Sequence, residues 1–93
     1  MTTICISIGN SDNKLTQMEW SAFVSDLDKI IQKYEATRHF FGGSVTWATW
    51  QNVMWCCELP TDSVDEIKRA ISLVRTHYRQ DAAFILYGSG EFV

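Results

Sequence analysis

Hydrophobic and polar residues alternate at the start of the chain and then change their spacing. Between residues 4 and 8, isoleucines occupy every second position with Cys5 and Ser7 between them, which is typical of a strand with one buried face. The small and polar residues at 9–14 predict a loop after this strand.

The next segment is a predicted helix. From Trp20 to Tyr34, apolar residues recur at steps of three and four, so they fall on one helical face. Thr16 and Glu19 have the spacing of a capping box, and Leu15 can pack against Trp20 across the first turn. We therefore expect this helix to begin directly after Thr16.

Two further strands and a turn follow. Residues 37–47 predict a strand interrupted by a glycine pair, and residues 48–51 predict the turn back. Alternating side chains over 52–59 predict the third strand, which Pro60 ends.

A second amphipathic helix and a last strand complete the pattern. Ser63 and Glu66 again have the spacing of a capping box. The apolar face of this helix is predicted to comprise Val64, Ile67, Ile71, Val74 and Tyr78. Residues 82–87 predict the last strand, and two glycines at 88–90 lead into a short tail.

The order strand–helix–strand–strand–helix–strand allows few topologies, because connections are short and crossovers right-handed. We expect an α+β ferredoxin-like βαββαβ sandwich, in which both helices cover one face of a four-stranded antiparallel sheet. The resemblance is one of architecture, spans residues 1–93 as a single domain, and points to no particular family.

Composition narrows the class of protein. The chain has 93 residues, 46% of them hydrophobic and 20% charged, as in a globular domain. A net charge of −3 argues against a general nucleic-acid binder and suits a basic partner. No apolar run approaches the ~20 residues of a membrane span, and no signal-like segment stands at the start, so we expect a cytoplasmic protein.

The three cysteines do not have metal-ligand spacing. Cys5 stands alone, while Cys56 and Cys57 are adjacent and would point to opposite faces of a strand. Reduced, apolar packing accounts for them better than a shared metal does. Cys5 and Cys56 could still face one another across two strands.

The predicted topology leaves one sheet face without helices. That face would expose an unusually apolar set: Cys5, Ser7, Met54 and Cys56, one of Phe40 or Phe41, and either Phe84 with Leu86 or Ile85 with Tyr87, beside Glu58. Large apolar patches mark contacts, so we expect a second chain here, most simply in a two-fold homodimer. The alternative is that the hairpin or the tail folds over this face.

The same topology gathers three loops at one end of the sheet. The candidate binding residues there are Asn10, Asp12, Lys14, Gly43, Ser44, Trp47, Trp50, Gln51, His77, Arg79 and Asp81. Loops on a rigid scaffold often carry function. Turn chemistry and a solvated rim explain most of the same residues without any function.

Catalytic chemistry finds little support. His77 is near Arg79 and Asp81 in sequence, which would suit a general base, although spacing alone does not set the ~3 Å reach that proton transfer requires. His39 precedes two phenylalanines in a predicted strand and suits a structural role. No nucleophile elbow, phosphate-binding loop or calcium loop is present, so we assign no catalytic residue, cofactor or metal.

Two functions remain open. The first is a non-catalytic protein-interaction module, such as a stoichiometric inhibitor of the toxin-immunity or phage anti-defence kind. Trp47 and Trp50 would anchor the partner, and Asp12 and Asp81 would face its basic patch. The alternative is a dimeric small-ligand-binding protein or enzyme with its pocket at the loop end.

Overall fold

The computed structural model describes residues 1–10, 13–44 and 51–93 of the chain. The elements in these residues are β1 (Thr2–Gly9), α1 (Gln17–Tyr34), β2 (Thr37–Gly43), β3 (Asn52–Leu59), α2 (Val64–His77) and β4 (Phe84–Gly88), with a 3-10 turn, η1 (Thr61–Ser63), before α2. Their order is the one predicted from the periodicities.

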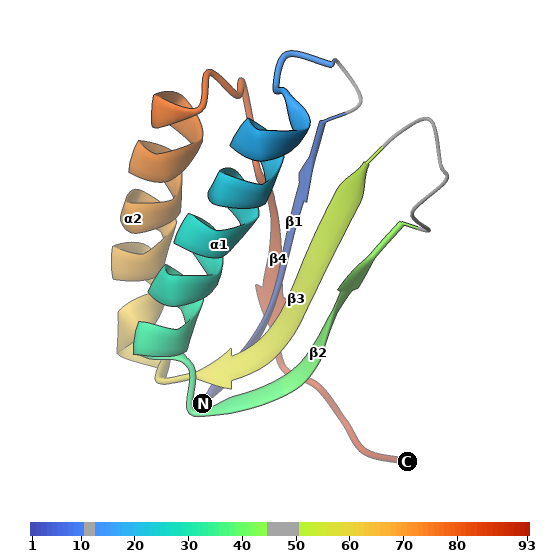
Figure 1. Cartoon of the computed structure of the whole chain (residues 1–93). Coiled ribbons are helices and arrows are strands. Elements are labelled where there is room, and N and C mark those ends of the chain that lie inside the picture. The colour runs from blue at the N-terminus through green and yellow to red at the C-terminus, as the bar shows by residue number, and fades with distance from the viewer. Residues whose placement is uncertain (11–12, 45–50) are drawn as a thin grey trace.

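The strands form one sheet in the order β2-β3-β1-β4, and all neighbouring strands are antiparallel. Both helices lie on the same side of this sheet, and the other side carries no helix (Figure 1). The predicted ferredoxin-like βαββαβ architecture is thereby confirmed. The two faces of the sheet consequently have different surroundings.

The core fills the space between the sheet and the helices. It includes Ile4, Ile6 and Ile8 from β1, Trp55, Cys57 and Leu59 from β3, Trp20, Phe23, Leu27 and Ile31 from α1, and Val64, Ile67 and Ile71 from α2. Burial alternates strictly along β1, as expected of a central strand with one covered face.

The two helices begin in different ways. Thr16 and Glu19 form the predicted capping box: the Glu19 amide donates to Thr16 Oγ1 over 3.1 Å, and the Thr16 amide donates to Glu19 Oε1 over 3.1 Å. The capping box predicted for Ser63 is wrong. Ser63 closes the turn after Pro60 with helical backbone angles, whereas a side-chain cap needs an extended residue at that position.

A polar network joins α1 to β2 and β3 at the edge of the core. The indole Nε1 of Trp55 donates to Asp28 Oδ1 over 2.9 Å. Arg38 contacts the same Asp28 oxygen at 2.8 Å and donates to Glu35 Oε2 over 2.9 Å. These bonds fix the end of α1 against the edge strand β2 and satisfy the polar atom of a fully buried tryptophan.

The Cys57 thiol and the Tyr78 hydroxyl make the stability of the fold vary with pH in the alkaline range. Burial raises the pKa of the Cys57 thiol from its usual 9.0 to about 11. The hydrogen bond that Tyr78 donates to Asp26 over 2.5 Å raises the pKa of Tyr78 from 10.0 to about 12. Both groups hold their protons more tightly in the folded chain than in the unfolded chain.

We therefore expect the free energy of unfolding to be highest below about pH 9 and to fall as the pH rises toward about 12. Urea unfolding at a series of pH values measures this. Tyr78→Phe should flatten the decline above about pH 10, and Tyr87→Phe serves as the exposed control. An unchanged slope in Tyr78→Phe would contradict the role given to Tyr78.

Candidate functional site

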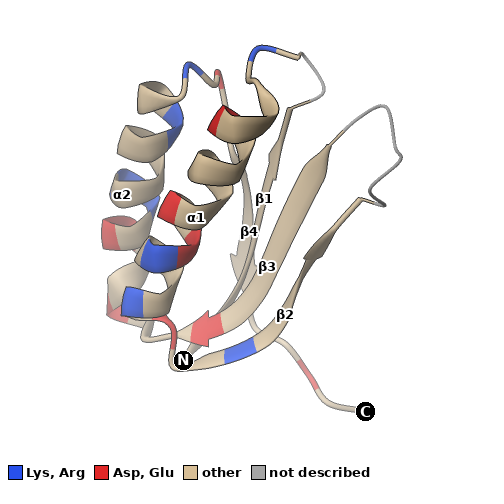
Figure 2. Ribbon diagram, viewed as in Figure 1, with Lys and Arg blue, Asp and Glu red and all other residues tan. Residues whose placement is uncertain are grey.

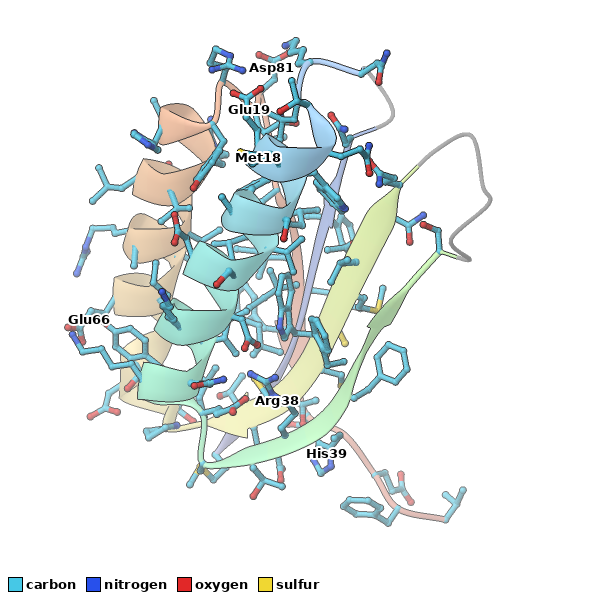
Figure 3. All side chains as sticks on the ribbon, in the orientation of Figure 1. Met18, Glu19, Arg38, His39, Glu66 and Asp81 are labelled. Carbon is cyan, nitrogen blue, oxygen red and sulfur yellow. The ribbon has the colours of Figure 1, made fainter. Side chains whose placement is uncertain are left out.

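The predicted loop cluster lies at the end of the molecule where β1 leaves the sheet and α2 ends. Figure 3 shows Glu19 and Asp81 together at this end, with Arg38 and His39 at the opposite end. Among the predicted site residues, Asp12, Trp47 and Trp50 lie outside the described residues.

Asn10 is buried at the exit of β1, with 3% of its surface exposed. Its amide Nδ2 donates to the Leu15 carbonyl over 3.0 Å, and its Oδ1 accepts from the Leu15 amide over 3.0 Å. Nδ2 also donates to Gln51 Oε1 over 3.1 Å, and Gln51 in turn pairs with Gln17. These bonds shape the β1–α1 loop and tie it to the start of β3.

Ion pairs connect the β1–α1 loop and the first turn of α1 with the α2–β4 loop. Lys14 Nζ is 3.3 Å from Asp81 Oδ2, and Arg79 Nη2 is 2.8 Å from Glu19 Oε2. The hydrogen bond from Arg79 is the main cause that lowers the pKa of Glu19. Because these groups are largely exposed, each pair adds little stability.

His77 is not part of this cluster. It is exposed at the end of α2, and its ring packs edge-on against the Tyr78 ring with centroids 5.0 Å apart. Within the described residues it makes no hydrogen bond to Arg79 or Asp81, so the geometry supplies no proton-transfer partner for it. The same residues contain no group of three metal-ligating side chains.

A hollow lies at the base of the β2–β3 hairpin, on the helix side of the sheet. Its volume is about 240 Å³, and it is lined by Trp20, Phe41, Gly42, Gly43, Ser44, Gln51, Asn52 and Val53. A side chain on Gly43 would place a Cβ 2.1 Å from the Asn52 carbonyl oxygen, so only glycine fits there. The predicted residues Gly43, Ser44 and Gln51 thus meet at one concave place.

The helix-free side of the sheet carries the clearest surface feature. We call it the outer face and define it by Phe40, Met54, Phe84 and Leu86, with Cys5, Ser7 and Cys56 between them. The four large side chains are 51%, 38%, 59% and 60% exposed. These residues form the row of exposed apolar side chains that the sequence predicted for the sheet face without helices.

The strand register settles two alternatives that the sequence left open. Phe40 pairs with Cys56 and belongs to the outer face, while Phe41 pairs with Trp55 on the helix side, after a register shift between Arg38 and Phe40. In β4, Phe84 and Leu86 take the outer face. Ile85 and Tyr87 point to the helix side.

Charge is scarce on the strands. Figure 2 shows Lys, Arg, Asp and Glu mainly on the helices and their connections. β1 and β4 contain none, β2 contains only Arg38, and β3 contains only Glu58. Glu58 contacts His39 at 3.3 Å near one end of the outer face. The greater part of that face is therefore uncharged.

The C-terminal tail crosses only this one end. It leaves β4 and passes behind the sheet toward β2 (Figure 1). The Phe92 ring lies 6.0 Å from the His39 ring, and a hollow of about 170 Å³ there is lined by Thr3, His39, Glu58, Gly90, Glu91 and Phe92. None of the four large side chains of the outer face lines this hollow, so the described tail leaves them exposed.

Comparison with solved structures finds protein SP2199 from Streptococcus pneumoniae, known from an X-ray crystal structure. The TM-score is 0.50 and the sequence identity 14%, over 98% of this chain and 89% of that chain. Comparison with family models and with curated proteins gives no match. The likeness shows a shared fold and assigns no function.

No helix in the described parts of the chain has the length and apolar character needed to cross a membrane.

Of the predicted site residues, the structure brings Lys14, Arg79 and Asp81 together and places Gly43, Ser44 and Gln51 around a hollow. Whether these groups bind anything stays a prediction. The alternation of side chains along the strands predicted an apolar outer face. The strand register then decided which of the alternative residues belong to it.

Proposed function

We propose that this chain is a non-catalytic protein-interaction module that binds its partner through the outer face. The observation that carries the proposal is the row of exposed Phe40, Met54, Phe84 and Leu86 on a sheet face that neither helix covers. Covering these side chains releases ordered water and contributes about 25 cal/mol per Å² of apolar surface.

A second copy of the chain is the simplest partner for this surface. An uncharged apolar face is complementary to itself, and most homo-oligomers pair the same patch around a two-fold axis. The charged residues lie mainly on the helices and their connections, and the net charge is −3. A basic partner could therefore bind elsewhere on the molecule. A stoichiometric inhibitor would use a surface of this kind to cover its target.

Substituting Leu86 tests the proposal. Leu86→Lys places a charge in the outer face, so we expect it to weaken self-association, or capture of a partner protein, at least about tenfold. Leu73→Lys is the matched control, because Leu73 is a 74% exposed leucine on α2, and α2 lies on the side of the sheet opposite the outer face (Figure 1). Light scattering measures the molar mass in solution, and affinity capture measures how much partner protein each variant retains.

Both variants should keep the circular dichroism spectrum of the parent chain, since neither leucine is buried. Equal loss of association in Leu73→Lys and Leu86→Lys would contradict the assignment to the outer face. If the parent chain is itself monomeric and captures no protein, the proposed function is contradicted.

The hollow at the base of the hairpin favours a second candidate, a small-ligand-binding protein. Trp20 and Phe41 provide apolar walls, and Ser44 and Gln51 provide polar atoms, which is the usual make-up of a ligand pocket. A thermal-shift screen of small aromatic and polar compounds tests it. A ligand of this hollow should stabilise Leu86→Lys as much as the parent chain, which distinguishes it from an occupant of the outer face.

A further inference from the structure

Cys5 and Cys56 face each other across the two central strands. They are direct partners in the β1–β3 register, and their Sγ atoms are 3.5 Å apart. Directly opposed residues of antiparallel strands have Cα atoms about 4.5–5.5 Å apart. Disulfides span Cα separations of about 4.4–6.8 Å, so rotation of the two side chains can bring the sulfurs to bonding distance without moving the strands.

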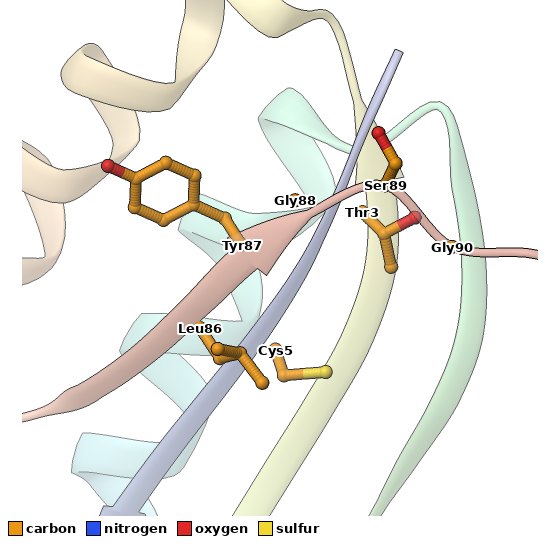
Figure 4. Close-up of a pocket in the computed structure, with 7 residues that line it drawn as sticks. All are labelled: Thr3, Cys5, Leu86, Tyr87, Gly88, Ser89 and Gly90. Carbon is orange, nitrogen blue, oxygen red and sulfur yellow. The ribbon is translucent and has the colours of Figure 1, made fainter.

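The two thiols differ in access. Cys5 lines a hollow of about 250 Å³ on the outer face, together with Thr3, Leu86 and residues 87–90 (Figure 4). Cys56 does not line this hollow but lies beside Cys5 and is half-buried. A reagent that enters the hollow therefore meets Cys5 first, with Cys56 in contact behind it.

Cys57 provides an internal reference. It follows Cys56 in β3 but points to the helix side, where it is fully buried in the core. Burial also raises the pKa of the Cys56 thiol, but the first attack falls to Cys5 because Cys5 lines the hollow and Cys56 does not. The arrangement thus distinguishes one accessible thiol, one adjacent thiol and one inaccessible thiol.

We propose that Cys5 and Cys56 form a dithiol–disulfide modification site that takes a small-molecule disulfide of the glutathione class as its oxidant. The Cys5 thiolate attacks one sulfur of glutathione disulfide, forming a mixed disulfide and expelling one glutathione thiolate. The Cys56 thiolate then attacks the Cys5 sulfur and expels the second. The two protons lost by the protein are taken up by the two glutathione thiolates, so two protein thiols are oxidised and one disulfide is reduced.

The bond would connect positions that are 51 residues apart in the sequence. Closing so long a loop restricts the unfolded chain, so the oxidised form should melt about 10 °C higher than the reduced form. The site lies within the outer face, but the inference does not rest on the proposed function, because it depends only on the register and on access in the free chain.

The experiment oxidises the full, reduced chain with glutathione disulfide, quenches with acid, and counts alkylatable thiols by mass spectrometry. The parent chain and Cys57→Ala should each lose two thiols to an internal bond. Cys57→Ala is needed for the mapping, because Cys56 and Cys57 share one tryptic peptide between Arg38 and Lys68. Cys56→Ser should stop at the mixed disulfide, with glutathione held on Cys5.

Cys5→Ser should form no internal bond. The proposal is overturned if the parent chain and Cys57→Ala keep all their thiols, if Cys57 exchanges as readily as Cys56, or if only bonds between chains form. Should a serine variant fail to fold, the peptide map and the melting temperature of oxidised Cys57→Ala still decide whether the internal bond forms. Because self-association through the outer face would cover Cys5, the oxidation is run at a protein concentration at which light scattering shows a monomer. Failure to form the bond in the monomer is then distinct from failure of the proposed function.

Discussion

Replacing Trp55 by alanine should destabilise the fold by about 3–5 kcal/mol, the range for truncating a buried aromatic residue. Trp55 is fully buried in β3, and its ring lies 5.3 Å from that of Phe41. The substitution also removes the indole donor to Asp28. A domain of this size has a total stability of order 5–15 kcal/mol, so this single change should leave it barely folded.

Urea unfolding followed by circular dichroism measures this loss. Met54→Ala is the matched control, because Met54 is the neighbouring residue on the outer face and is 38% exposed. Its truncation should cost less than about 1 kcal/mol. Trp55→Phe keeps an aromatic ring in the core but removes the indole donor and leaves a small cavity, so we expect a loss between those of Met54→Ala and Trp55→Ala, about 2–3 kcal/mol. A Trp55→Ala chain as stable as Met54→Ala would show that the core is not organised around this residue.

Asn10→Ala should cost about 2–4 kcal/mol, although the position looks like an ordinary loop residue in the sequence. The truncation leaves both the amide and the carbonyl of Leu15 without their partner in a buried loop. An unsatisfied buried backbone group costs about 1–3 kcal/mol. The change also frees Gln51 from its contact with Asn10 Nδ2.

The control for Asn10 is Asp81→Ala at the same end of the molecule. The Asp81 side chain is 94% exposed and its ion pair with Lys14 is solvated, so its loss should cost no more than about 0.5 kcal/mol. Asn10→Asp keeps an acceptor for the Leu15 amide but buries a carboxylate oxygen against the Leu15 carbonyl, so it should be destabilised at least as much as Asn10→Ala. If Asn10→Ala unfolds at the same urea concentration as the parent chain but loses a ligand or partner, Asn10 serves binding and not loop structure.

Local patterns predicted the elements well because each pattern depends on neighbouring residues only. The isoleucines of β1 and the capping box at Thr16 are complete within a few positions, and both are observed. The second capping box failed although Ser63 and Glu66 have the right spacing. Its outcome depended on the turn that Pro60 and Thr61 make beforehand, which spacing does not encode.

The candidate site was harder to predict because the role of a polar residue depends on its partners. Asparagine is a common turn residue, yet Asn10 is as buried as a core residue. Its side-chain amide hydrogen-bonds the backbone amide and carbonyl of Leu15, which no local pattern reveals. Lys14 and Asp81 are distant in sequence and meet only when the loops gather. The hypothesis that Trp47 and Trp50 anchor a partner concerns residues outside those described and stays a prediction.

The amino-acid order alone was enough to establish six elements, their types and the topology they adopt, because periodicity and short connections leave few arrangements. Tertiary pairing was needed to decide which side chains meet. Strand register put Phe40 rather than Phe41 on the outer face and set Cys5 against Cys56. The physical reason is that alternation along a strand defines its two faces but does not say which face is buried or which residue lies opposite on the next strand. Long-range hydrogen bonds and core packing select both.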